Sequence, residues 1–210
     1  MDLIVFGTVF LEVVFGDMPA LPGPGQEIFT DQFAFSVGGA AVTAASAASG
    51  LGARAGMSAL LGDDLGSRMA EQHCRRAGVD MTPCRYVTGP VTGVSVAVNF
   101  GGDRAFISHL PPRPAGERRD TRRWLDVLRE HRPRWCYVHA GPGVAPFVRQ
   151  ARSLGVHVAL ACTGSIPSVT RVVFPGVATT APSAPRVTTT QGHHLVAAVI
   201  ASASEAAAVS

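Results

Sequence analysis

The chain has 210 residues, of which 47% are apolar and 16% charged, so its composition is that of a globular protein with one large or two small domains. Its formal net charge of +3 is small, and we interpret the basic stretch at 113–134 as a solvated helix face, which argues against nucleic-acid binding. All 18 basic residues are Arg, and the absence of Lys excludes a P-loop lysine and a Schiff-base lysine.

The cysteines and the apolar segments indicate a cytoplasmic protein. The cysteines lie far apart in the sequence, at Cys74, Cys84, Cys136 and Cys162. They form no CxxC pair, which argues against a zinc site or a disulfide framework and fits a reducing cytoplasm. The apolar stretch at 3–15 is not preceded by a cation, so we interpret it as a buried strand and not as a secretory signal. No apolar run reaches membrane-spanning length, so we expect a cytoplasmic protein.

The first part of the chain predicts alternating strands and helices. Short apolar runs that stop at glycine, such as 1–6 before Gly7, are typical of central strands. Asp64 is an expected N-cap, and Gly78 an expected helix end. The expected elements are strands at 1–6, 10–15 and 26–37, a helix at 40–49, a strand at 53–61 and a helix at 65–77. This order predicts an α/β fold with a parallel sheet.

A β-hairpin follows that does not fit a parallel sheet. In the expected strand at 92–100, every second residue is apolar or Thr, namely Thr92, Val94, Val96 and Val98, which therefore share one face. Gly101-Gly102-Asp103 is the expected turn, and 104–109 form the expected returning strand. With 10–16 and 27–36, this hairpin predicts a small separate antiparallel sheet. The α/β pattern then resumes with a helix at 118–131, a strand at 134–139, a helix at 144–153 and a strand at 156–161.

The composition changes after Cys162. Residues 163–210 are rich in Ala, Ser, Thr, Val and Pro, and the only acidic residue between His131 and Ser210 is Glu205. We predict one helix at 195–208 and interpret 162–210 as a low-complexity tail or the product of a shifted reading frame. The expected domain division is a partial α/β domain at 1–161 followed by this tail.

Gly38 and Gly39 stand where the strand at 26–37 meets the helix at 40–49. Glycine permits a positive φ at such a junction and leaves no Cβ in the way. A helix that begins there aims unpaired N–H groups at the space in front, which suits the polar oxygens of a ligand. The alternative is a tight turn whose glycines only permit close packing.

Residues 1 to about 160 resemble the N-terminal half of the PfkB/ribokinase family of carbohydrate kinases. The motifs that carry the resemblance are GTVFLE (7–12), LPGPGQE (21–27), SVGGAAVTAA (36–45), LGARAGMSALLGDDLG (51–66), AGVDMT (77–82) and VTGVSVAV (91–98). Their order and spacing are more specific than any one of them. The resemblance implies a ribokinase-like, Rossmann-type αβα core, incomplete here, with a small antiparallel β lid built from about 10–36 and 91–109. It also implies ATP-dependent phosphoryl transfer to a sugar or nucleoside hydroxyl.

The resemblance implies a set of substrate-binding residues. Glu12 matches an acidic position, commonly Asp in the family, that grips sugar hydroxyls; the alternative is a lid glutamate in solvent. Gly38 and Gly39 match the glycine pair whose backbone approaches the sugar. Thr43 stands where ribokinase-like members have an Asn, and the loss of that Asn weakens the case for ribose. Thr43 can still donate and accept one hydrogen bond. Thr92 matches a lid position over the substrate.

The family's catalytic motif is missing from this chain. Family members carry a GAGD loop whose Asp acts as the general base on the acceptor hydroxyl. This chain has no GAGD and no Asp after Asp126. ATP and Mg²⁺ are the cofactors that the resemblance implies, but the Asn-Glu motif linked to them is absent, and the sole Asn is Asn99. We therefore assign no catalytic residue.

We expect a truncated or frameshifted sugar kinase without appreciable activity. The alternatives are a non-catalytic sugar-binding or dimerisation module and a fragment without function. The resemblance implies a small-molecule sugar or nucleoside as the partner, no nucleic acid or membrane, and a homodimer through the β lid, because family members often dimerise through that sheet.

Overall fold

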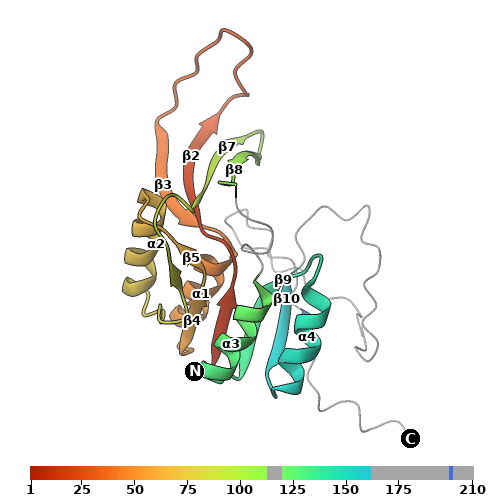
Figure 1. Cartoon of the computed structure of the whole chain (residues 1–210). Helices are drawn as coiled ribbons and strands as arrows, with labels where there is room; N and C mark the ends of the chain where they lie inside the picture. The colour runs from red at the N-terminus through yellow and green to blue at the C-terminus, as the bar shows by residue number, and fades with distance from the viewer. Residues whose placement is uncertain (113–119, 162–198, 201–210) are drawn as a thin grey trace, which may run out of the picture.

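The structure is a computed structural model that describes residues 1–112, 120–161 and 199–200. The chain forms a layered α/β core, and a second, smaller β-sheet projects from one end of that core (Figure 1). We call the second sheet the lid sheet.

The core is built on a five-stranded sheet with the order β11-β10-β9-β1-β4. β1 pairs in parallel with β4 and with β9, β9 pairs in parallel with β10, and β11 runs antiparallel to β10. The strands span Leu3–Phe6 (β1), Ala55–Ser58 (β4), Trp135–His139 (β9), His157–Ala161 (β10) and Val199–Ile200 (β11).

Helices cover both faces of this sheet, as the α/β pattern predicts. They span Ala40–Gly50 (α1), Leu65–Arg76 (α2), Thr121–His131 (α3) and Val144–Ser153 (α4). Ile4 and Phe6 of β1 pack with α3 and α4, whereas Val5 points the other way and packs with α1 and α2. All three side chains are fully buried, so β1 is the centre of a three-layer αβα core.

Two helices begin at the aspartates that cap them. The Asp64 carboxylate accepts a hydrogen bond from Ser67 N at 2.8 Å, and the Asp120 carboxylate accepts one from Arg123 N at 3.0 Å. α1 instead relies on small residues, and Ala41 and Ala45 are fully buried against the sheet. The expected αβα layering is therefore confirmed.

The lid sheet has four strands in the order β3-β2-β7-β8. They span Phe10–Met18 (β2), Gln32–Gly38 (β3), Gly93–Phe100 (β7) and Asp103–His109 (β8). β7 and β8 form the expected hairpin, with positive φ at Gly101 and Gly102 in its turn. The sheet was expected to be antiparallel, but β2 runs parallel to β7, so it is mixed. The reason is topological, since both strands leave the core in the same direction.

The remaining differences from the expected elements follow from strand pairing. The strand expected at 26–37 begins only at Gln32, because its partner β2 pairs no further than Gly16 with it. The strand expected at 53–61 divides into β4 and β5 (Leu60–Leu61), and β5 pairs with β6 (Arg85–Tyr86) in a separate two-stranded sheet.

The predicted tail lies mostly outside the described residues. The helix expected at 195–208 is wrong at Val199 and Ile200, which form β11 against β10. The other residues of that helix and of the segment at 162–210 lie outside the described part. Within the described residues, no helix is both long and apolar enough to cross a membrane.

Candidate functional site

A cavity of about 1080 Å³ opens between the lid sheet and the first turns of α1. We call it the lid cavity. All four lid strands contribute to its wall, and α1 and α2 supply the opposite side. Its polar lining residues are Glu12, Asp17, Ser36, Thr43, Ser46, His73, Asn99, Asp103 and Arg104. A concave surface with converging polar groups is typical of a small-molecule site.

Glu12 lies against Gly38 at the base of the lid cavity. The two strands are held in register by pairing of Glu12 with Ser36 and of Phe10 with Gly38. A Cβ built on Gly38 would overlap the Glu12 carboxylate, so this carboxylate lies directly over the Gly38 backbone. Gly38 is buried, and any side chain there would push the carboxylate out of its place.

Gly39 joins β3 to α1 in a conformation that favours glycine. Its φ is 87°, and a Cβ at this position would overlap the carbonyl oxygen of Thr8. Gly39 is the N-cap of α1, has no side-chain cap, and accepts the first helical hydrogen bond from Thr43 N at 3.0 Å. The pair therefore permits close packing, and it also places the positive end of the α1 dipole beside the Glu12 carboxylate.

Thr43 and Ser46 line the lid cavity from consecutive turns of α1. Thr43 is exposed, so its hydroxyl is accessible to a ligand. The Ser46 hydroxyl is buried and has no hydrogen-bond partner of ordinary geometry among the described residues. Burial raises the pKa of the neighbouring Cys74 thiol, and the nearby Ser46 hydroxyl partly offsets this. The sequence did not single out Ser46, because an alanine-rich helix gives no sign of which serine faces a cavity.

Thr92 lies away from the other predicted site residues. It is buried and does not line the lid cavity. Its hydroxyl lies 2.8 Å from the Ser67 hydroxyl, and its N–H donates to the Asp64 carboxylate at 3.1 Å. The structure thus brings Glu12, Gly38, Gly39 and Thr43 together and leaves Thr92 at the base of β7, where the lid sheet meets the core.

The hairpin of the lid sheet adds polar residues that sequence reasoning missed. Asn99 of β7 pairs with Arg104 of β8, and both line the lid cavity. The Arg104 guanidinium also lies over the Phe106 ring, 5.4 Å from its centroid. The alternation of side chains along β7 could have predicted that Asn99 and Ala97 share one face of the sheet. That Glu12 lies on the same face follows only from the register between β2 and β7.

All the carboxylates that line the lid cavity come from the lid sheet. Its acidic lining residues are Glu12, Asp17 and Asp103, and all three belong to β2 or β8 of the lid sheet. Among the described residues, no group of three His, Cys, Asp or Glu side chains is placed to hold a metal ion. The side chains that line the cavity can therefore accept hydrogen bonds from hydroxyl groups and donate hydrogen bonds to them. The described part of the core sheet adds no carboxylate to the cavity.

Comparison with known proteins identifies the family. The profile described as pfkB family carbohydrate kinase matches residues 13–123. The chain belongs to the PfkB family. No curated protein matches it.

Solved structures of PfkB-type kinases share the fold. Ribokinase from Arabidopsis thaliana, complexed with ribose and ATP, has a TM-score of 0.63 at 18% identity over 78% of this chain and 54% of that chain. Ribokinase from Giardia lamblia has a TM-score of 0.59 at 17% identity, over 80% and 52%. 2-Dehydro-3-deoxygluconokinase from Thermotoga maritima has a TM-score of 0.59 at 18% identity, over 79% and 52%. The PfkB chain described here thus spans about half the length of these relatives.

Proposed function

We propose that this chain supplies the sugar-binding part of a PfkB sugar kinase, and that the lid cavity holds hydroxyl groups of a sugar or nucleoside. The observation that carries the proposal is the Glu12 carboxylate lying over Gly38, beside the N-terminus of α1. A carboxylate can accept hydrogen bonds from two neighbouring hydroxyls. The Thr43 hydroxyl and the first N–H groups of α1 supply further hydrogen-bonding groups beside it.

The reaction that we propose for the complete family fold is ATP-dependent phosphoryl transfer to a sugar hydroxyl. The residues present do not fit ATP and Mg²⁺, because the chain has no GAGD loop and its sole Asn, Asn99, lies in the lid sheet. No Asp follows Asp126, so no aspartate replaces the missing general base. We therefore expect the chain to bind a sugar and to transfer no phosphoryl group.

Calorimetry against a panel of pentoses, hexoses and nucleosides, without ATP, tests the binding proposal. We expect one sugar class to bind, and the Glu12→Ala variant to weaken that binding about tenfold or more, since a hydrogen bond to a charged group contributes about 1.5–3 kcal/mol. Glu27→Ala is the matched control, because Glu27 is an exposed glutamate that does not line the lid cavity.

Three results would contradict the proposal. If no sugar binds, or if Glu12→Ala binds as well as the unmodified chain, the lid cavity is not a sugar site. If the purified 210-residue chain phosphorylates a sugar with ATP above the Glu12→Ala background, the claim that it lacks a base is wrong.

The face of the lid sheet that points away from the lid cavity indicates a second role for this chain, dimerisation. One row of side chains runs across all four strands through Phe35, Val13, Val96 and Ile107, which are paired neighbours. Phe35 is 57% exposed and Ile107 is 73% exposed. An apolar stripe of this kind is typical of an interaction site. We propose that a second copy of the chain covers it.

We also propose that the family domain ends near residue 161 and that 162–210 is a low-complexity or aberrant tail, of which Val199 and Ile200 pair with β10 at the edge of the core sheet. The support is the change in composition after Cys162. Translating the gene in its other reading frames downstream of about residue 161 tests this, because an Asn-Glu segment followed by GAGD in another frame would identify a frameshift. Three free, buried cysteines in the described part support a cytoplasmic location.

A further inference from the structure

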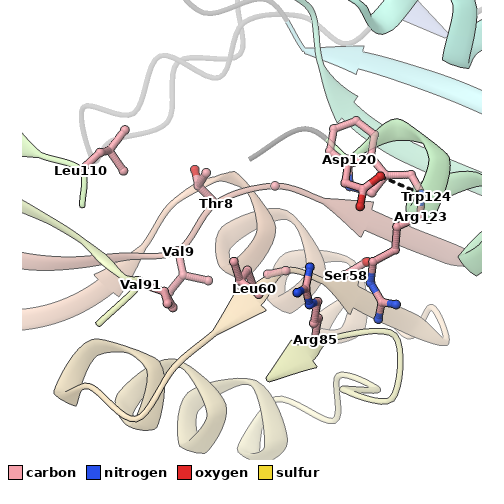
Figure 2. Close-up of a pocket in the computed structure, with 12 residues that line it drawn as sticks. Thr8, Val9, Ser58, Leu60, Arg85, Val91, Leu110, Asp120, Arg123 and Trp124 are labelled. Carbon is pink, nitrogen blue, oxygen red and sulfur yellow. Dashed lines mark hydrogen bonds between the residues drawn. The ribbon is translucent and has the colours of Figure 1, made fainter. Parts of the chain in front are cut away.

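A second cavity, of about 60 Å³, lies where the chain passes between the core and the lid sheet. We call it the hinge cavity. Its walls come from 7–9 just before β2, Val91 before β7, Leu110 after β8, Ser58 at the end of β4, and the first turn of α3 (Figure 2). It shares no lining residue with the lid cavity. Its volume suffices for several water molecules or one small anion, since a single water needs about 10–15 Å³ on the same measure.

Two arginines from different elements line this cavity. Arg85 belongs to β6 and Arg123 to the first turn of α3, and Figure 2 shows their guanidinium groups converging near Ser58. Among the described residues, neither guanidinium has a hydrogen bond or an ion pair with another side chain. Two like charges that face one space repel each other, and an anion between them removes that repulsion.

The hinge cavity also has one acidic lining residue, whose carboxylate already caps α3. Asp120 is the one acidic residue among its lining residues, and its carboxylate accepts the hydrogen bond from Arg123 N that caps α3. Two positive charges and one negative charge leave the cavity with a net positive charge. The guanidinium groups supply the unused donors, because each carries five N–H groups in a planar fork.

We propose that the hinge cavity binds a small oxyanion, the phosphate or carboxylate group of a metabolite, between Arg85 and Arg123. Arginine forks match both groups through paired N–H···O bonds. The Ser58 hydroxyl donates to the Pro83 carbonyl at 3.1 Å, so the recognition rests on the two guanidinium groups and not on this serine. Since Val91 and Leu110 flank the lid hairpin, the bound anion lies where the lid sheet joins the core.

Titration of inorganic phosphate into the full-length chain, at constant ionic strength set with sodium chloride, tests the proposal. We expect saturable binding by calorimetry, weakened on the order of tenfold by Arg85→Gln and by Arg123→Gln, because each removes charge-assisted hydrogen bonds. Asp120→Asn should tighten phosphate binding, since Asn remains a good N-cap and the negative charge is gone. Malonate in a parallel titration distinguishes the two sources, because the tighter anion identifies the natural group.

Arg122→Gln is the matched control. Arg122 lies in the same turn of α3, is exposed, and does not line the hinge cavity, so its variant should bind phosphate as the unmodified chain does. Far-ultraviolet circular dichroism checks that every variant folds. The proposal is overturned if neither phosphate nor malonate binds, if the Arg85→Gln/Arg123→Gln double variant binds as tightly as the unmodified chain, or if Arg122→Gln weakens binding equally.

Discussion

At the scale of single residues, the position of the Glu12 carboxylate depends on a missing side chain at Gly38. A Cβ at Gly38 would occupy the space of that carboxylate, so Gly38→Ala should move it away from the N-terminus of α1. We expect this variant to weaken sugar binding as much as Glu12→Ala does. We also expect it to lower the free energy of unfolding by about 1–3 kcal/mol, the usual cost of adding a methyl group to a packed site. Calorimetry and urea denaturation measure the two effects.

Gly50→Ala separates this steric effect from the general properties of glycine. Gly50 ends α1, and a Cβ there would meet no atom within 4 Å. Because alanine is the better helix former, this variant should leave sugar binding unchanged and raise the free energy of unfolding by up to about 1 kcal/mol. If both glycine variants weaken sugar binding alike, the contact between Gly38 and Glu12 is not what positions the carboxylate.

At the scale of elements, Asp64 ties the N-terminus of α2 to the entry of β7. One carboxylate oxygen accepts from Ser67 N, and the other accepts from Val91 N at 2.7 Å and from Thr92 N at 3.1 Å. Burial on its own raises the pKa of Asp64, but the bonds donated by Val91, Ser67 and Thr92 lower it from 3.8 to about 2. The ionised carboxylate thus holds the base of the lid sheet to the core.

This lowered pKa predicts a loss of stability in acid. Since the folded-state pKa lies below the unfolded value, the stabilisation is complete above about pH 4 and disappears as the pH falls to about 2. After allowance for solvent exposure, we expect about 1–2 kcal/mol of the free energy of unfolding to be lost over this window. Urea denaturation at pH 2 to 7 measures it.

The Asp64→Asn variant should be less stable than the unmodified chain at pH 7 and should lack this part of the acid-dependent loss. Asp126→Asn is its control, because Asp126 makes an exposed ion pair with Arg129, and such pairs contribute about 0–1 kcal/mol. An Asp64→Asn variant with the same pH profile as the unmodified chain would show that Asp64 does not hold the lid.

Much of the fold was predictable because its signals are local. The apolar run of β1 stops at Gly7, α2 begins at its Asp64 cap, and Gly101 and Gly102 form a turn. The parallel pairing of β2 with β7 was not predictable, since about 75 residues separate the paired strands and their directions depend on how each leaves the core.

The candidate site was predictable only where the family motif covers it. Glu12, Gly38, Gly39 and Thr43 were placed by their motifs, and the structure brings them together. Asn99 and Arg104 were missed because their place depends on the register of the lid sheet. Thr92 fits the alternating pattern of a lid strand, but its hydrogen bonds with Ser67 and Asp64 hold it where the lid sheet meets the core. Alternation gives a face of a sheet and does not reveal such a network.

At the scale of the whole molecule, the lid sheet has two unlike faces. One face carries Glu12, Val14 and Asn99, which line the lid cavity. The other carries Phe15, Phe33 and Phe35, whose rings contact one another with centroid distances of 5.3 and 5.1 Å. Phe33 and Phe35 are each more than half exposed, so this aromatic cluster is incompletely buried in a single chain. A partner with a matching apolar surface would remove that area from water.

We propose a second copy of the chain as this partner, and this predicts a dimer that dissociates when the apolar row is lost. Sedimentation velocity of the unmodified chain should show a monomer–dimer equilibrium at micromolar concentration. The double variant Phe35→Ser/Ile107→Thr should raise the dissociation constant by at least about tenfold, because central apolar contacts of this kind often contribute 2 kcal/mol or more. Phe29→Ser is the control, since Phe29 is 84% exposed and lies outside the sheet. A chain that stays monomeric at tens of micromolar, or a double variant that dimerises as before, would assign the apolar face of the lid sheet to another partner.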